Sequence, residues 1–173
     1  TSIEDVHPQA QVLPENMLRM YISFSSPMMP GEAYDHITLL TENGTRVEKA
    51  FLIIDQELWD PERKRFTLLF DPGRVKRGIQ SNMELGSPLQ AGQAYRLVID
   101  SNWRDASGNY LSASYTKTFT VSSAERTKLS TKNWKITTPE AGTNDKLMIE
   151  FDRPIDYALA SKCISITTSR SGK

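Results

Sequence analysis

The sequence predicts an all-β protein built as an antiparallel β-sandwich. In several short segments apolar and polar residues alternate with a period of two, which is typical of strands with one buried face. Turn signals rich in glycine and asparagine separate these segments at short intervals. Helical patterns are few, so helix is expected to be a minor component.

The expected strands follow one another along the chain as far as Val121. The alternation is clearest at residues 18–24, where Leu18, Met20, Ile22 and Phe24 share one face. The other expected strands are residues 37–41, 47–54, 65–70, 95–99 and 115–121. Turns are expected between them at residues 42–44, 71–73, 91–93 and 107–109. Two helical turns are expected, at residues 31–35 and 155–161.

An internal repeat predicts more than one structural unit. Phe24, Pro27 and Ile37 recur at one constant offset as Phe151, Pro154 and Ile164, in the order strand, Phe-x-x-Pro, helical turn, strand. We expect a first unit over residues 1–122, a polar linker over 123–131 and a partial second unit over 132–173. The second unit is too short for an independent sandwich, so the native polypeptide is expected to continue past Lys173.

Three motifs lie in a fixed order in the first unit. Phe-Ser-Ser-Pro-Met stands at 24–28, Gly-Gln-Ala-Tyr-Arg-Leu-Val-Ile at 92–99, and Asp-Ala-Ser-Gly-Asn-Tyr-Leu at 105–111 before Phe-Thr-Val at 119–121. Together they resemble the bacterial immunoglobulin-like domains first described in S-layer proteins. The resemblance covers nearly all of the first unit and the opening of the second. It implies a seven-stranded immunoglobulin-like sandwich, often found in tandem, in a secreted or surface-anchored protein.

Two details of these motifs agree with sandwich physics, and one segment departs from the family. Pro27 lacks an N–H group and cannot continue an inner strand, so a core strand is expected to end just before it. Leu111 is expected to be a core contact after the turn at 107–109. The segment 59–78 is not part of the usual family pattern, which leaves room for an added function there.

Composition and charge exclude several classes of protein. Lys plus Arg and Asp plus Glu both number 21, so no global charge favours nucleic acid or an anionic membrane surface. The segment 1–60 nevertheless carries 3 basic and 10 acidic side chains, and the segment 61–173 carries 18 and 11. No apolar run is long enough for a membrane-spanning helix, so neither nucleic-acid binding nor membrane insertion is expected. Cys163 is the only cysteine; it allows no internal disulfide and is expected to be a buried thiol.

Residues capable of catalysis do not form a recognisable constellation. The only histidines are His7, before Pro8, and His36, before an expected strand, and no nucleophile motif accompanies either. Asp55, Glu57 and Asp60 surround Trp59 as in some sugar-binding clefts, although a catalytic pair is not favoured. Asp100 and Asp105 lack the spacing of a calcium loop and are expected to form turns. No catalytic residue, metal site or cofactor is therefore expected.

The best candidates for a binding role are aromatic and basic. Trp59 and Trp103 lie in polar, loop-like surroundings, where a tryptophan can stack on a sugar ring, or can instead close one end of the sandwich core. The basic segment includes Arg74, Lys76 and Arg77. These residues form either a solvated surface balanced by acids elsewhere in the fold or a contact for an extended polyanion.

These observations favour a non-enzymatic immunoglobulin-like module that acts as a structural spacer or as an adhesion and interaction domain. The alternative is a carbohydrate-binding accessory domain of an exported protein, using Trp59, Trp103 and the basic segment. The expected partners are a protein or polysaccharide at the cell envelope and neighbouring domains of the same chain. The expected location is extracellular, on the cell surface or periplasmic.

Overall fold

A computed structural model describes residues 1–76, 78 and 80–167 of the 173-residue chain. The chain divides into two compact units, unit 1 over Thr1–Arg126 and unit 2 over Thr127–Lys173. The division falls inside the segment 123–131, which the sequence predicts as a linker. The tandem repeat itself stays a prediction, and each unit is described separately below.

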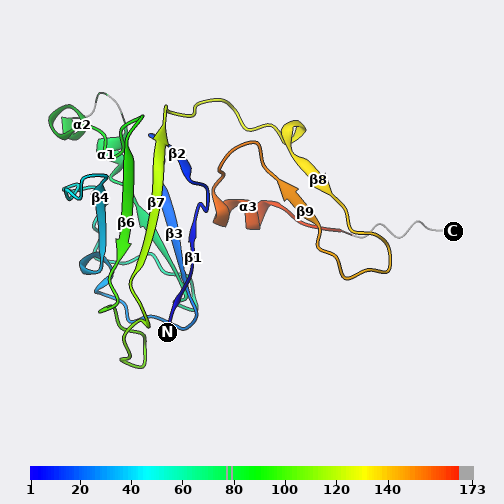
Figure 1. Cartoon of the computed structure of the whole chain (residues 1–173), viewed down its shortest axis with the longest axis horizontal. Helices are drawn as coiled ribbons and strands as arrows, with labels where there is room; N and C mark the ends of the chain where they lie inside the picture. Colours follow the sequence, from blue (N-terminus) through cyan, green and yellow to red (C-terminus); the bar gives the residue numbers. More distant parts are fainter. Residues whose placement is uncertain (77, 79, 168–173) are drawn as a thin grey trace. The chain divides into compact units, whose positions relative to one another are not determined.

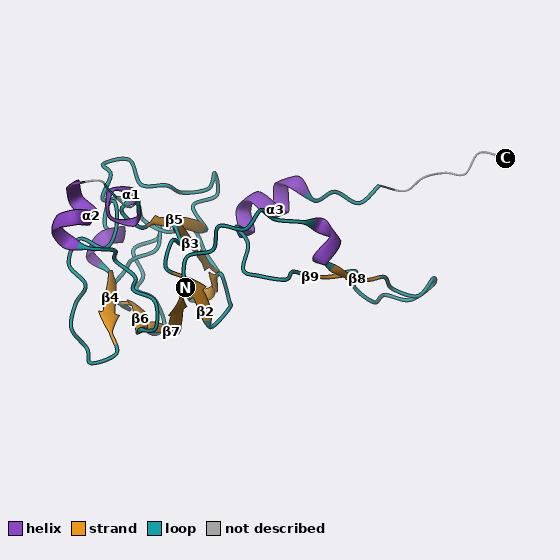
Figure 2. Cartoon of the chain, turned by 90° about the horizontal axis from the view of Figure 1, so that it is seen from above, coloured by secondary structure: helices purple, strands orange, loops and turns teal. Residues whose placement is uncertain are grey.

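Unit 1 contains two packed sheets (Figure 1). One sheet has the strand order β1 (Ile3–His7), β3 (Arg19–Phe24) and β5 (Arg65–Leu69). The other has the order β2 (Val12–Pro14), β7 (Tyr115–Ser122), β6 (Ala94–Ile99) and β4 (Ile37–Thr41). Figure 2 looks along the strands and separates β3 and β5 from the layer of β4, β6, β7 and β2. The predicted all-β sandwich is confirmed.

The topology of unit 1 is immunoglobulin-like. β3 and β5 lie in one sheet while β4, β6 and β7 lie in the other, which is the strand distribution of immunoglobulin sandwiches. The chain leaves the first sheet after β1, passes the cis peptide bond between His7 and Pro8, and joins the second sheet as β2. β2 runs parallel to β7, whereas the sequence predicts antiparallel pairing and no strand at 12–14. So short a strand cannot show an alternating pattern.

The buried residues of β3 follow the predicted alternation. Met20, Ile22 and Phe24 of β3 are all 1 % exposed or less. Leu111 is 4 % exposed, so its predicted place in the core is confirmed. Tyr21 points away from these residues but is also buried, because the Arg65 guanidinium lies over its ring at 5.7 Å from the centroid.

The strand predicted at 47–54 does not form. Within it only Phe51 makes an isolated bridge, with Phe70, and a second bridge joins Arg46, just before the segment, to Leu40. Lys49, between the two bridges, has a φ of 49°, a left-handed conformation that breaks an extended strand. The segment therefore passes from the edge of one sheet to the edge of the other without pairing continuously with either.

The helices of unit 1 lie in connections. The helical turn predicted at 31–35 is confirmed as η1 (Ala33–Asp35). The turn predicted at 71–73 is instead the start of α1 (Pro72–Val75), where the Asp71 side chain accepts a hydrogen bond from the Gly73 N–H at 2.8 Å. α2 (Gln80–Leu85) follows and was not predicted, because it is too short to show a helical period.

Unit 2 contains η2 (Thr131–Asn133), β8 (Lys135–Thr137), β9 (Met148–Glu150) and α3 (Tyr157–Cys163). β8 and β9 form an antiparallel pair, and α3 confirms the helical turn predicted at 155–161. Cys163 is exposed at the end of α3, so its predicted burial is wrong; no second layer covers this helix among the described residues of the unit. The strand expected at Ile164 is not formed either.

None of the helices in the described residues is long and apolar enough to span a membrane.

Candidate functional site

Trp103 lies in an aromatic cluster at one end of the unit 1 core. Its side chain is 0 % exposed, and its ring contacts Phe24 edge-on at 5.1 Å and Phe66 at 6.0 Å between centroids. His36 stacks on another side of the indole at 5.8 Å. The tryptophan that the sequence offers as a ligand contact therefore closes the core and is not accessible to a ligand from solvent.

Trp59 is half-buried at the edge of the same cluster. Its ring packs on Phe66 at 5.0 Å and on Trp103 at 5.8 Å. The indole Nε1 donates a hydrogen bond to the Glu57 carboxylate at 2.7 Å, which fixes the ring orientation. The cluster therefore covers part of this ring and leaves part of it exposed.

Glu57 holds the loop before η1. Its two carboxylate oxygens accept hydrogen bonds from the Gly31 and Ala33 N–H groups, both at 2.7 Å. With the indole of Trp59 this makes three donors on one carboxylate, a strong charge-assisted arrangement. The sequence does not indicate this role. Gly31 and Ala33 lie far from Glu57 in the chain, and the contact with Trp59 depends on how the short loop between Glu57 and Trp59 folds.

The other acids near Trp59 have surroundings that differ from those of Glu57. Asp60 accepts hydrogen bonds from the N–H groups of Lys64 and Arg65 at 2.8 and 3.0 Å, which closes the turn before β5. Asp55 is exposed. Two of the three carboxylates are thus engaged in organising backbone.

Asp105 organises the turn at 105–109 as predicted. Its carboxylate accepts hydrogen bonds from the N–H groups of Ser107 and Asn109 and from the Thr1 hydroxyl. The hydrogen bond from Thr1, followed by that from Asn109, lowers the pKa of this carboxyl below its usual value. Asp100 accepts from the Asn102 N–H in the preceding turn. Across the part of the chain that the structure describes, no group of three or more His, Cys, Asp or Glu side chains could hold a metal ion.

Arg74 is a buried structural residue, which corrects its assignment as a ligand contact. It is 5 % exposed, and its guanidinium donates hydrogen bonds to the carbonyls of Glu48, Lys49, Leu85 and Gly86. Burial lowers the pKa of Arg74, and nearby Asp71 partly opposes this effect. The side chain joins the connection after β4 to the end of α2 and is not available to a polyanion.

Lys76 is exposed and lines an open groove of about 360 Å³ with Asn16, Leu18, Val75 and Arg126. A second hollow of about 340 Å³ shares Asn16, Val75 and Arg126 with it. Arg77 lies outside the described residues. The predicted basic contact is therefore reduced, in the described structure, to Lys76 with Arg126 as a neighbour that the sequence did not indicate.

The two histidines are mostly buried, and each lies beside a more exposed carboxylate. His7 Nε2 lies 4.0 Å from Asp5, and His36 Nε2 lies 3.7 Å from Glu32. Burial lowers the pKa of His7, while Asp5 acts in the opposite direction. Both rings belong to the edges of strands, as the sequence indicates.

Two further polar residues have roles that the sequence did not reveal. The Asn16 side chain donates to the Glu125 carbonyl at 2.7 Å and accepts from the Glu125 N–H at 3.0 Å, which fixes the chain after β7. Lys117 faces the core from β7, where its Nζ donates to the carbonyls of Gln9 and Ala10. The alternation of β7 predicts that Lys117 points inward. Its carbonyl partners could not be predicted, because they lie in the connection that carries the chain from β1 in one sheet to β2 in the other.

Comparison with known proteins gives little beyond this geometry. No family model and no curated protein matches the sequence. Among solved structures the chain is similar to native alpha-2-macroglobulin from Escherichia coli spanning domains MG0-NIE-MG1, with 13 % sequence identity and a TM-score of 0.41. The match covers 70 % of this chain and 32 % of that one, so the chain spans about a third of the neighbour's length.

Proposed function

We propose that unit 1 is a non-enzymatic spacer and interaction module of an exported protein. In this proposal the chain belongs with the S-layer-type immunoglobulin-like domains that its three motifs resemble. Its location is then extracellular, at the cell surface or periplasmic, and its neighbours are other domains of the same chain.

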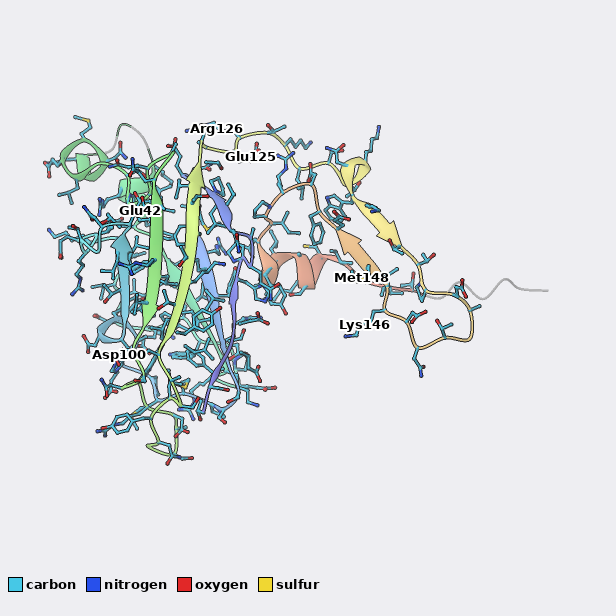
Figure 3. All side chains as sticks on the ribbon, in the orientation of Figure 1. Glu42, Asp100, Glu125, Arg126, Lys146 and Met148 are labelled. Carbon is cyan, nitrogen blue, oxygen red and sulfur yellow. The ribbon has the colours of Figure 1, made fainter. Side chains whose placement is uncertain are left out.

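The observation that carries the proposal is the position of the two ends of unit 1. Thr1 lies beside the loops at one end of the sandwich, where its carbonyl accepts a hydrogen bond from the Ser112 N–H at 2.8 Å. β7 then runs the length of the sandwich and delivers the chain to Glu125 and Arg126 at the other end, opposite Asp100 (Figure 3). Its 8 residues, at about 3.4 Å each, span about 27 Å. A domain entered at one end and left at the other extends the chain by its own length.

The polar residues of unit 1 support a role without catalysis. Glu57, Asp60, Asp105 and Arg74 direct their side chains to backbone groups of unit 1 itself. Groups used in this way stabilise loops and are poorly placed to take part in proton transfer to a substrate. Adhesive contacts would then use the outer surface, and the groove lined by Lys76 and Arg126 offers a place for a protein or an anionic polysaccharide.

Distance measurement tests the spacer role. Residues 1–126 contain no cysteine, so spin labels can be attached to cysteines introduced at exposed Ser2 and Ser123. A rigid spacer gives one narrow distance distribution at about 30 Å, the length of the sandwich along β7, unchanged by envelope polysaccharides. A broad distribution, or a mean distance well short of the length of the sandwich, would contradict it.

A glycan array distinguishes the carbohydrate-binding alternative. The spacer and interaction proposal expects no neutral glycan to be retained by the chain above background, and any retained anionic glycan to be kept by Trp59→Ala. Retention that is lost in Trp59→Ala, but kept in Tyr110→Ala as a matched exposed aromatic, would overturn the proposal in favour of a carbohydrate-binding domain.

A further inference from the structure

The buried positions of unit 1 extend the internal repeat well beyond the three residues that first indicated it. From the start of β3 to the end of β4, seven apolar side chains are 2 % exposed or less: Met20, Ile22, Phe24, Met28, Ala33, Ile37 and Leu39. Their counterparts at the offset that joins Phe24 to Phe151 are all apolar: Leu147, Ile149, Phe151, Ile155, Ala160, Ile164 and Ile166. Phe24 and Ile37 established the offset, so the other five are independent agreements. With 38 % hydrophobic residues in the chain, composition alone does not explain them.

The elements of unit 2 follow the same order as those of unit 1. β9 lies where the offset puts β3, and α3 includes the counterparts of η1. The strand pairing agrees as well: Ile22 of β3 is paired with Val6 of β1, and its counterpart Ile149 of β9 is paired with Ile136 of β8. β8 and β9 thus correspond to the first two strands of the three-stranded sheet of unit 1.

The two units differ in what covers these residues. Val6 and Leu39 are 2 % and 1 % exposed, whereas Ile136 and Ile166 are 58 % and 76 % exposed. In unit 1 the side chains of β4, β6 and β7 fill the other half of the core, and β5 pairs with the second edge of β3. Residues 127–167 include no counterpart of β5, β6 or β7. The apolar face of β8 and β9 is therefore only partly covered within the described part of unit 2, and the second edge of β9 has no paired strand there.

The same comparison explains why residues 164–167 do not form a strand. Their counterpart in unit 1 begins β4, whose ladder partner is β6. A strand gains its backbone hydrogen bonds only from a neighbour, so a segment without its neighbour stays irregular. The irregular conformation of 164–167 therefore agrees with the lack of a paired strand within the described part of unit 2.

We propose that unit 2 is the acceptor half of a second immunoglobulin-like sandwich, completed by a segment of the same polypeptide that follows α3. That segment supplies one strand patterned like β5, which pairs antiparallel with β9, and a hairpin patterned like β6 and β7, which pairs with residues 164–167. Strand addition of this kind combines backbone hydrogen bonds with alternating apolar side chains that enter the open core. This inference does not depend on the spacer function of unit 1.

Hydrogen exchange measured on residues 1–173 and on the native-length gene product tests the proposal. In residues 1–173 the amides of 164–167 should exchange rapidly. In the native-length protein they should exchange slower by about two orders of magnitude or more, as expected for amides in a paired strand. The amides of β3 in unit 1 are the internal control and should not change between the two proteins.

A pair of variants of the native-length protein separates a buried face from a general loss of structure. Ile149→Asp places a charge on the face that the proposal buries and should remove the protection of 164–167. Met148→Asp alters the adjacent, outward position, which is 63 % exposed, and should preserve it. Equal effects of the two variants would overturn the proposal.

Two other results would also overturn it. One is a native-length protein in which 164–167 remain unprotected. The other is concentration-dependent dimerisation of residues 1–173 that protects these amides, because a second copy would then be the partner in place of the following polypeptide.

Discussion

Phe24 joins the two sheets of unit 1 at the aromatic cluster. It is 1 % exposed and contacts both Trp103 and Trp59, at 5.1 and 5.9 Å between ring centroids. Phe24→Ala leaves a cavity among rings that cannot collapse easily, so we expect the free energy of unfolding of unit 1 to fall by about 3–5 kcal/mol. Urea denaturation measures the change. Tyr110→Ala removes a ring that is 53 % exposed and should shift the urea midpoint much less. Equal shifts for the two variants would contradict the assignment of Phe24 to the core.

Asp105 makes the stability of unit 1 depend on pH in the acid range. Its pKa is lowered in the folded state, chiefly by the hydrogen bond from Thr1, so the unfolded state binds protons more readily. The stabilisation is therefore complete above the unfolded value of 3.8 and is lost as the pH falls through the folded pKa. We expect Asp105→Asn to lower the melting temperature at pH 7, and this difference to shrink below about pH 4. A difference that stays constant from pH 7 to pH 2 would contradict this assignment.

Single residues differ in how far their roles follow from sequence. The burial of Phe24 and Leu111 could be predicted, because alternation and turn chemistry depend on near neighbours in the chain. The burial of Trp103 and Arg74 could not be decided, because it depends on which distant segments cover them. Glu57 is a similar case: its acceptor role arises only when the chain after β4 returns beside the loop before η1.

The connection between β5 and β6 is organised around Arg74. The four carbonyls that it satisfies come from the segment before β5 and from the end of α2. Arg74→Ala leaves these acceptors without their donor in a buried site, and we expect it to lower the free energy of unfolding by about 2–3 kcal/mol. Lys76→Ala, close by in the chain and exposed, should change it by less than about 0.5 kcal/mol. Chemical denaturation of both variants measures these changes. Similar changes in the free energy of unfolding for the two variants would contradict a buried, hydrogen-bonded role for Arg74.

Elements with continuous partners were predicted better than elements without them. The strand predicted at 37–41 has the bounds of β4, which pairs along its whole length with β6. Residues 47–54 have the composition of a strand but meet their neighbours at isolated positions only. β2 is the reverse case, since its residues owe their strand conformation to β7 rather than to a pattern of their own. Strand propensity therefore becomes a strand only where the topology supplies a partner.

At the scale of the whole molecule, the sandwich of unit 1 closes its core and the described part of unit 2 does not. Trp134 and Phe151 form an edge-on pair at 4.8 Å, yet Leu159 and Ile136 remain 60 % and 58 % exposed. The repeat stays a prediction from the spacing of core positions. The sequence indicates that the second unit is too short for an independent sandwich, but it does not show which of its apolar side chains stay exposed, because burial depends on strands outside the repeat.

The path of the chain through unit 1 also determines how it should respond to tension. Force on Thr1 and Arg126 first loads β1 against β3 and then pulls β2 and β7 along their parallel axes in opposite directions, so the hydrogen bonds between β2 and β7 are loaded together in shear. Force on cysteines introduced at Ser101 and Ser114 separates the adjacent ends of β6 and β7 and breaks their hydrogen bonds one after another.

We expect single-molecule pulling on residues 1–126 to require a clearly higher unfolding force from the termini than from positions 101 and 114. The two geometries share one folded state and one free energy of unfolding, so a difference between them reports the direction of loading alone. A module that transmits tension in an exported protein needs this resistance along its own axis. Equal forces in the two geometries would show that the β2–β7 pair does not bear the load.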